Sequence, residues 1–449
     1  VLYLIVTLIV GIYYRSKSSS FHGYGEFSSK SSEVTPSVFV LMATIFATAV
    51  GGGTIFGLAE KSFSNDLSLA CGLILTIPID IIIAFYIVPK LTLHYGAVST
   101  GDVMGKFYGE SGRIIAGVGA LLASLGYVAA QINVSGRIFE HILGFERNYG
   151  VIFSYMVVVT YTAIGGLRSV VFTNILQFLT MVAAIPMITI IGTYKIGLGP
   201  LIHSIDTKYY TEFDFHTICN IIAAALSFSV MGFYPSFIQR ALMNKDSRNI
   251  KPAIIIKSFI YAFFIMCVTI NGLLAFVIDS KQSSSMAIPN MIDTIIPIGF
   301  RGVVVIGLLA AVTSTASSDL NVASISIIND IFRPLSHIKR QTLLLLLVKL
   351  NTLFIGFGSI FLALKFNHVL DLIVFSGGFW APMVAVPMVA GVFGFIIEKW
   401  KFIISSCVGI SSFFLWEYMA IYPPLKGVFV GTIVNLFCFI ISRPKKILL

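Results

Sequence analysis

Hydroxyl side chains gather in one stretch of the chain that is otherwise hydrophobic. Residues 311–321 read Ala-Val-Thr-Ser-Thr-Ala-Ser-Ser-Asp-Leu-Asn, within an apolar run that extends over 300–331. Hydroxyls such as Ser314 and Thr315 are neutral oxygen ligands, and a turn of the same helix supplies carbonyl oxygens, so the stretch suits a small hard cation such as Na⁺. The alternative is that these hydroxyls bond to carbonyls of their own helix or join it to neighbouring helices. The density of the cluster favours the cation site.

The composition of the whole chain places this cluster in a membrane protein. Of the 449 residues, 57% are hydrophobic and 11% are charged, and the mean hydropathy is +0.93. Soluble domains carry about 25% charged residues. The chain therefore has too few polar side chains to cover a water-facing surface, which excludes a soluble enzyme, a disordered hub and a nucleic-acid-binding protein. We interpret the net charge of +10 as loop charge that faces a membrane surface.

Enzyme chemistry has no basis in the remaining residue types. The five cysteines are far apart and lie mostly in apolar runs, which fits neither a disulfide framework nor a zinc cluster. The sequence contains no metal motif, nucleophile elbow or acid–base pair of polar residues. We expect neither an enzyme nor a bound cofactor.

Apolar runs of about 20 residues, the length that crosses a bilayer as a helix, recur along the whole chain. The connections between them are short and contain Gly, Pro, Ser or charged residues. We predict an all-α polytopic membrane protein with about thirteen transmembrane helices. We divide it into a first helix with a cytoplasmic loop (1–36), a core (37–396) and two C-terminal helices (397–449). The predicted spans are 1–14, 37–59, 68–93, 112–143, 149–166, 170–194, 217–240, 253–278, 300–331, 342–364, 369–396, 401–420 and 425–442.

The positions of Lys and Arg predict the orientation of the chain. About two thirds of the 30 Lys and Arg residues fall in loops on one side of the predicted spans, counting Arg15, Lys17, Lys30, Arg240 and Lys257. Cytoplasmic loops are enriched in these residues. The protein is therefore predicted to cross the cell membrane with its N-terminus outside and its C-terminus in the cytoplasm. Because the sequence starts inside an apolar run, it does not tell whether its N-terminus is complete.

Two of the predicted spans are poor continuous helices. Gly51, Gly52 and Gly53 follow one another, and each glycine destabilises a helix interior by about 1 kcal/mol relative to alanine. In the second span, Gly232 and Pro235 flank two aromatic residues, and proline lacks a backbone donor. Non-helical backbone inside a membrane is tolerated only where it is buried in protein or lines a cavity. We therefore expect a binding cavity at the breaks, with close helix packing as the alternative explanation of the glycines.

The two breaks occupy equivalent places in the order of helices. If 37–59 is the first helix of a core, the second broken helix, 217–240, is the sixth. A separation of five helices between equivalent breaks indicates an inverted five-plus-five repeat, in which the interrupted segments mark the binding site of a secondary transporter.

Acidic residues inside predicted spans are candidates for function, because burying a charge in a membrane is unfavourable. Asp80 can relay a proton, hold a cation or belong to a structural network, and the sequence does not distinguish these roles. Asp319 is predicted to hydrogen-bond between helices, and Asp371 is predicted to be solvated near a helix end.

The sequence at the breaks predicts a compact solute. No Arg or Lys lies at either break, and no acidic residue lies beside the glycines. A neutral or zwitterionic solute such as an amino acid fits this pattern, because the free ends of the broken helices can satisfy a carboxylate and an amine.

Four sequence motifs resemble the sodium/solute symporter family, which includes bacterial proline, sialic acid and sodium–galactose symporters. The clearest is residues 165–177, Gly-Gly-Leu-Arg-Ser-Val-Val-Phe-Thr-Asn-Ile-Leu-Gln, and 237–242, 307–331 and 376–382 also match. The resemblance covers the chain from end to end. It implies a LeuT-like fold and sodium-coupled import of a small organic solute by alternating access.

The resemblance also implies roles for individual residues. The principal sodium site falls on the carbonyls of Ala47, Val50 and Ala311 and the hydroxyls of Ser314 and Thr315. Solute is expected at the unwound segments, on Gly51, Gly52, Thr54, Tyr234, Ser236 and Phe237.

A second sodium ion in some family members uses hydroxyls that match Ser317 and Ser318 together with an aspartate that is Asn174 here. The substitution removes a negative charge, which favours one sodium ion per solute. Proline is the favoured substrate among amino acids. The alternatives are a proton-coupled carrier that uses Asp80 and a membrane sensor, which the end of the sequence shortly after Lys446 disfavours.

Overall fold

The computed structural model describes residues 2–14, 20–25, 35–142, 144–205, 215–336, 338, 340–365, 369–422 and 425–447. Much of the predicted first cytoplasmic loop, with Arg15, Lys17 and Lys30, lies outside these residues, as does the side chain of Asp371.

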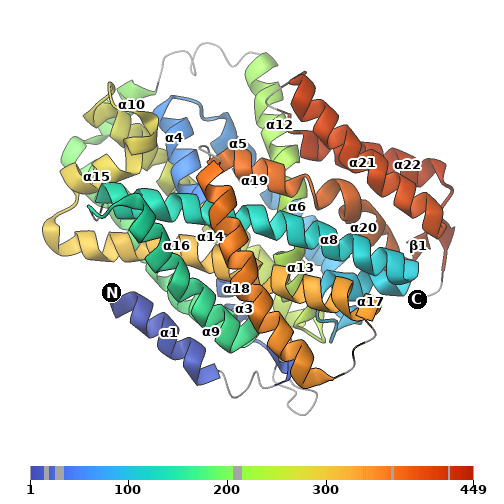
Figure 1. Ribbon diagram of the computed structural model, residues 1–449. Coiled ribbons are helices and arrows are strands. Elements are labelled where there is room, and N and C mark those ends of the chain that lie inside the picture. Colours follow the sequence, from blue (N-terminus) through green and yellow to red (C-terminus); the bar gives the residue numbers. More distant parts are fainter. Residues whose placement is uncertain are drawn as a thin grey trace.

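Helices account for nearly all of the regular structure in the described part of the chain (Figure 1). Two strands of two residues each, β1 (Phe395–Ile396) and β2 (Lys445–Lys446), pair antiparallel. The helices are α1 (Leu2–Tyr14), α2 (Phe21–Gly25), α3 (Val38–Ala49), η2 (Gly53–Gly57), α4 (Leu58–Phe63), α5 (Ser68–Ile74), α6 (Ile77–Ile82), η3 (Ile83–Ile87), α7 (Val88–Leu91), η4 (Thr92–His94), α8 (Thr100–Arg137), η5 (Ile138–Ile142), α9 (Arg147–Ile196), α10 (Leu198–Ser204), α12 (Phe215–Gly232), α13 (Pro235–Leu242), α14 (Ser247–Ile278), η6 (Ser284–Met286), α15 (Ala287–Ile295), α16 (Ile298–Ile325), η7 (Ser326–Phe332), α17 (Arg333–Ser336), α18 (Gln341–Lys365), α19 (Val369–Gly377), η8 (Ala381–Ala385), α20 (Val386–Val392), α21 (Lys399–Met419) and α22 (Gly427–Ile441).

The number of membrane crossings differs from the predicted thirteen. Within the described residues, nine helices are long and apolar enough to span a membrane, or ten if α3 and the segment Gly53–Phe63 count as one bent span. The apolar helices Tyr3–Tyr14 and Gly427–Ile441 are shorter than a full span. The count of thirteen is therefore not confirmed, although the mainly helical, multi-pass architecture is.

One difference from the predicted spans has a local cause. The predicted spans 149–166 and 170–194 both lie in α9, a helix of 50 residues in which Gly166 has φ 60° and ψ −157°. This conformation is open to glycine and strained for other residues, so the chain changes direction at Gly166 without a loop. The periodicity of a sequence does not show such a bend.

Both predicted helix breaks occur in the structure. After α3 the backbone of Val50 is extended, with φ −94° and ψ 97°, and the halves α3 and Gly53–Phe63 meet at an angle of 61°. The second break follows Gly232, and Tyr234 is extended with φ −121° and ψ 170°. Pro235 then opens α13, a position where the missing N–H of proline does no harm.

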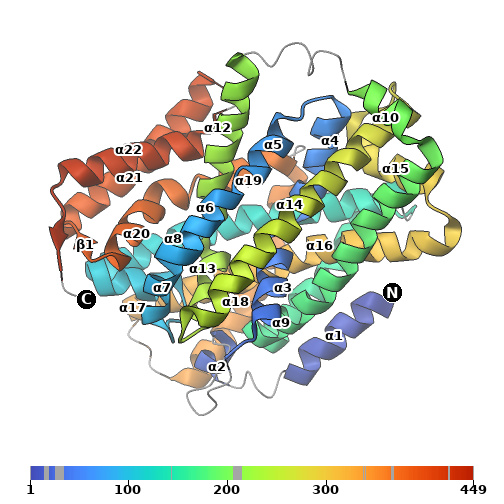
Figure 2. The ribbon, with the colours of Figure 1, turned by 180° about the vertical axis from the view of Figure 1, so that it is seen from behind.

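The broken helices lie in the middle of the molecule. The helix α3 packs against α9, α14 and α16, and α13 packs against α3, α8 and α16. In Figures 1 and 2, α1 lies at one side of the molecule and the pair α21 and α22 at the other, with these helices between them. Both breaks are therefore enclosed by neighbouring helices.

Candidate functional site

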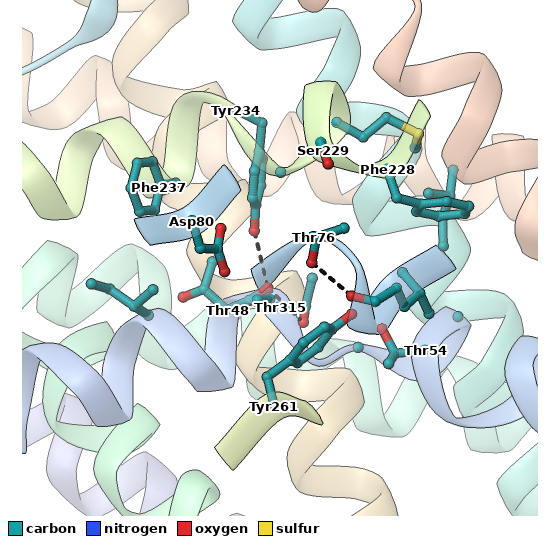
Figure 3. Close-up of a pocket in the computed structure, with 18 of the residues that line it drawn as sticks. Thr48, Thr54, Thr76, Asp80, Phe228, Ser229, Tyr234, Phe237, Tyr261 and Thr315 are labelled. Atoms are coloured by element: carbon teal, nitrogen blue, oxygen red, sulfur yellow. Dashed lines mark hydrogen bonds between the residues drawn. The ribbon is translucent and has the colours of Figure 1, made fainter. Parts of the chain in front are cut away.

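A cavity of about 150 Å³ lies between the two breaks. Its wall combines residues from both broken helices with residues of α5, α6, α8, α14 and α16. Figure 3 shows Tyr234 and Tyr261 reaching into it from opposite sides, with Thr48 and Thr315 between them. The polar residues of the wall are Thr48, Thr54, Thr76, Asp80, Tyr127, Gln131, Ser229, Tyr234, Arg240, Lys257, Tyr261 and Thr315.

Four of the six residues that the sequence assigned to the solute line this cavity, namely Gly51, Thr54, Tyr234 and Phe237. The other two make contacts elsewhere. The amide of Gly52 donates to Oε1 of Gln131 at 2.7 Å, and the hydroxyl of Ser236 donates to the carboxylate of Asp319.

The glycines of the first break also serve close packing. A Cβ atom at Gly52 would lie 2.7 Å from the side chain of Val134, and one at Gly51 would lie 3.0 Å from Oγ1 of Thr315. The two explanations of the glycine run therefore apply together. These residues end the helix, and they bring the backbone of the break close to α8 and α16.

Thr315 faces the backbone of the first break. Its Oγ1 lies 3.5, 3.3 and 3.4 Å from the carbonyl oxygens of Ala47, Thr48 and Val50. Hydrogen bonds between a hydroxyl and an oxygen are normally 2.5–3.0 Å long, so none of these contacts is a well-formed hydrogen bond. The side chain is 4% exposed. One hydroxyl and three carbonyl oxygens thus converge on a small space at the end of α3.

The neighbouring hydroxyls of α16 bond mainly to their own helix. Ser314 Oγ donates to the carbonyl of Ala311 at 2.9 Å, and Ser317 Oγ donates to the carbonyl of Ser314 at 3.1 Å. Thr313 bonds to the carbonyl of Leu309 at 2.8 Å. The hydroxyl oxygen of Ser314 and the carbonyl oxygen of Ala311 are therefore adjacent, as two ligands of one ion must be. The same contact is also the usual hydrogen bond of a serine within a helix.

Asn174 lies in a buried group of hydroxyls. Its Nδ2 donates to Thr44 Oγ1 at 3.0 Å, to Thr48 Oγ1 at 3.3 Å and to Ser318 Oγ at 3.3 Å. The hydroxyls of Thr48 and Ser318 are 3.0 Å apart. The amide thus connects α9 to α3 and α16 through its donor, while its Oδ1 has no hydrogen-bond partner among the residues that the structure describes.

Arg240 is fully buried beside this group. Its Nη2 donates to Ser318 Oγ at 2.8 Å, and its Nη1 donates to Gln239 Oε1 at 2.8 Å. Ser236 links Arg240 to Asp319, because its carbonyl accepts from Nη1 at 3.3 Å and its hydroxyl donates to the carboxylate. The contact of Asp319 is a hydrogen bond between helices, as predicted.

Asp80 forms an ion pair with a residue of another helix. Nζ of Lys257 lies 2.8 Å from Asp80 Oδ2, and both residues line the cavity. The expectation that no Arg or Lys lies near the breaks is therefore wrong, since Arg240 also lines the wall. From the sequence, Arg240 and Lys257 are both expected to be loop charges. Arg240 lies in the last turn of α13 and is fully buried, and Lys257 comes from α14, far from Asp80 along the chain.

Several wall residues were not singled out from the sequence, and polar residues in apolar runs are the signal that marks them. Gln131 and Tyr127 lie four residues apart in α8, and Lys257 and Tyr261 have the same spacing in α14. This spacing places each pair on one helix face. Such pairs in otherwise apolar spans could have been read as cavity-facing.

The fold is that of LeuT-type secondary transporters. The structure of a substrate-bound, outward-open Na⁺-coupled sialic acid symporter superposes with a TM-score of 0.85 at 18% sequence identity, covering 99% of this chain and 98% of that one. MhsT in complex with L-phenylalanine gives a TM-score of 0.55 at 18% identity, covering 93% of this chain and 99% of that one. These likenesses confirm the predicted LeuT-like core.

The chain belongs to the sodium:solute symporter family, whose model matches residues 33–397. The osmoregulated proline transporter OpuE of Bacillus subtilis is 24% identical, over 99% of this chain and 94% of OpuE. The high-affinity proline transporter PutP of the same species is 25% identical, over 85% of this chain and 84% of PutP. The sodium/sialic acid symporter SiaT of Proteus mirabilis is 21% identical, over 74% of this chain and 70% of SiaT. These relatives are transporters and not enzymes.

Proposed function

We propose that this protein is a secondary active symporter that couples the import of a small organic solute to Na⁺. The observation that carries the proposal is the convergence of Thr315 Oγ1 with the carbonyls of Ala47, Thr48 and Val50 at 3.3–3.5 Å. Membership of the sodium:solute symporter family supports the same function.

The spacing of these oxygens fits a shared cation better than it fits hydrogen bonds. Around a hard cation with oxygen ligands at about 2.4 Å, neighbouring ligands at right angles lie about 3.4 Å apart. The distances from Thr315 Oγ1 match this separation. We propose that Ala47, Val50 and Thr315 hold the ion and that Ser314 and Ala311 complete its shell. No cofactor is required.

The position of this site explains how an ion can act on the solute. Val50 and Gly51 belong to the same break, and Gly51 and Thr315 both line the cavity. An ion bound here stabilises one arrangement of α3 against α16, and solute binding at the adjoining wall favours closure. A ligand shifts such an equilibrium only through its different affinity for the two states, which is the basis of alternating access.

We propose a coupling ratio of one Na⁺ per solute. The hydroxyl of Ser318 accepts from Arg240 Nη2 at 2.8 Å and faces Asn174 Nδ2 at 3.3 Å. A cation needs oxygen lone pairs, whereas these two neighbours present N–H groups, and one of them carries a positive charge. The groups around Ser318 therefore disfavour a second cation. This effect adds to that of Asn174, which lacks the negative charge of an aspartate.

We propose an amino acid as the solute, with proline favoured. The printed names of OpuE and PutP describe proline transporters. A cavity of about 150 Å³ suits a small amino acid better than a nine-carbon sugar such as sialic acid. Leucine, isoleucine and phenylalanine side chains of the wall, among them Leu73, Ile83 and Phe237, supply an apolar surface for its ring.

We also propose that the N-terminus lies outside the cell membrane and the C-terminus in the cytoplasm. The excess of Lys and Arg on one side of the predicted spans supports this orientation, and it remains when Arg240 and Lys257, which line the cavity, are left out of the count. Cysteine accessibility at the two ends, measured in intact and in opened cells, tests it.

Uptake into proteoliposomes tests the proposed function and its main rival. Radiolabelled solute should accumulate when an inward Na⁺ gradient is present and should not accumulate with an inward proton gradient in sodium-free buffer. The rival is a proton-coupled carrier that uses Asp80, whose carboxylate lines the cavity. Accumulation driven by protons alone would favour that rival and overturn the proposal.

A further inference from the structure

The ion pair of Asp80 and Lys257 lies on the wall of the cavity rather than in a loop. The two side chains are 22% and 11% exposed, and both line the space between the breaks. We infer that this pair binds the two charges of a zwitterionic solute, with Asp80 receiving the ammonium group and Lys257 the carboxylate. The inference rests on the proposed transport function and names the residues that select the solute.

The geometry of the pair leaves groups free for a ligand. Lys257 Nζ and Ser258 Oγ both donate to the same oxygen, Asp80 Oδ2, at 2.8 and 2.7 Å. No donor among the described residues is within hydrogen-bonding distance of Oδ1. The ammonium of Lys257 carries three N–H groups, and Asp80 takes one of them. One acceptor oxygen and two N–H donors thus remain available side by side.

The energetics of the pair also point to function. A buried ion pair is usually no more stabilising than a pair of apolar side chains of the same volume, because both charges lose their hydration. Ionised groups within membrane-spanning helices are accordingly rare and mark ligand or ion sites. Here the lysine also lies 5.2 Å from the ring centre of Tyr261, which keeps its head group at the cavity wall.

A zwitterion suits this pair better than an ion of one sign. Its ammonium and carboxylate together add no net charge, so Asp80 and Lys257 each keep a partner of opposite sign when the solute binds. An anion or a cation alone would leave one charge of the wall without a partner, which is unfavourable in a site with little water. Charge-assisted hydrogen bonds at both ends would also fix the orientation of the solute.

The other charges near the cavity do not take over this role. Both terminal nitrogens of Arg240 already donate, Nη1 to Gln239 and Ser236 and Nη2 to Ser318, and only its Nε lacks a partner among the described residues. The guanidinium also lies near Asp319, which balances its charge. The charges of a zwitterion therefore meet the Asp80–Lys257 pair, and not only the backbone ends of the broken helices as the sequence suggested.

Thermal unfolding of the purified protein in sodium buffer tests the inference with defined probes. The panel contains L-proline, L-prolinamide and cyclopentanecarboxylate, then L-alanine, L-alaninamide and propionate, and finally sialic acid and galactose. We expect a zwitterion to protect the wild-type protein, with its amide and its amine-free acid needing at least tenfold higher concentrations. Equal protection by the amide or the acid, protection by a sugar alone, or no protection by any zwitterion would overturn the inference.

Substitutions then separate the two charges. Asp80→Asn should raise the concentration of zwitterion for half-maximal protection at least tenfold and remove the preference over the acid, because only the ammonium loses its partner. Lys257→Gln should remove the preference over the amide instead. If the pair were purely structural, either substitution would weaken the binding of all solutes alike. Unchanged preferences in both variants would also contradict the inference.

The surface ion pair of Lys61 and Asp66 provides the control. Its atoms are 3.4 Å apart, and its side chains are 49% and 41% exposed, so Lys61→Gln and Asp66→Asn should leave every preference unchanged. Protection by sodium alone reports whether each variant is folded. If sodium and potassium act alike on the wild-type protein, the proposed sodium coupling fails, while the preference for zwitterions is still judged by the solute panel.

Discussion

Two hydroxyls of α16, Thr315 and Ser318, lie within one turn of each other and differ in what surrounds them. Thr315 faces the carbonyl oxygens of Ala47, Thr48 and Val50. Ser318 faces N–H groups of Asn174 and Arg240, together with the hydroxyl of Thr48 at 3.0 Å. The first environment consists of acceptors and suits a cation, and the second contains donors and a resident positive charge. A hydroxyl residue alone does not make a sodium site. Whether the groups that face it are hydrogen-bond acceptors or donors determines whether a cation can bind.

The largest expected effect comes from removing the resident charge. Arg240→Met should lower the unfolding free energy by about 3 kcal/mol, because the buried carboxylate of Asp319 loses its neighbouring cation. Thermal unfolding of the purified variant measures this loss. The double variant Arg240→Met with Asp319→Leu should recover most of it. A single variant as stable as the wild-type protein would contradict the account of the Ser318 environment.

Thr315→Ala should raise the sodium concentration for half-maximal uptake tenfold or more, since a tenfold change corresponds to about 1.4 kcal/mol of lost binding. Sodium titration of solute uptake measures it. Thr315→Ser retains the oxygen and should stay close to the wild-type value. As a second control, Ser324→Ala removes a hydroxyl of the same helix that bonds to Leu320 and Thr352, and it should not change the sodium dependence.

Asn174→Asp sharpens the comparison by adding a carboxylate beside Ser318. We expect the coupling ratio to stay at one, because Arg240 lies 2.8 Å from the same hydroxyl and would pair with the new charge. Measurement of reversal potentials in vesicles gives the ratio. A ratio of two in the variant would show that Arg240 does not prevent a second Na⁺ from binding near Ser318. A ratio of two in the wild-type protein would show that Asn174 does not prevent it either.

Ser317→Ala should have the smallest effect. Its hydroxyl bonds to the carbonyl of Ser314 in its own helix at 3.1 Å, so its removal should change the sodium concentration for half-maximal uptake by less than about threefold. The same sodium titration applies. A tenfold change would place Ser317 among the ion ligands and weaken the contrast between the two environments.

The helix breaks could be predicted because their cause is local. Three consecutive glycines weaken a helix in any surroundings, and so do Gly232 and Pro235 placed three residues apart. The helices are interrupted at both places. At 167–169 a loop between two spans was predicted, whereas the chain bends at Gly166 within the continuous helix α9, and only the positive φ of this glycine reveals the turn. This bend is one reason why the count of thirteen spans was not recovered.

The charged residues of the cavity could not be derived in the same way. Asp80 and Lys257 are 177 positions apart, and no pattern in either helix specifies that they meet. Arg240 follows the second break closely and was counted with the cytoplasmic loop, because charged residues are usually exposed. Its burial depends on Ser318, Gln239 and Ser236, which surround the guanidinium only in the folded protein.

Binding of radioactive sodium to the purified protein tests the central claim most directly. The account predicts one Na⁺ per wild-type molecule at saturation and a loss of this binding, by tenfold or more in affinity, in Thr315→Ala. Saturation at two ions, or binding to Thr315→Ala with the wild-type affinity, would contradict it.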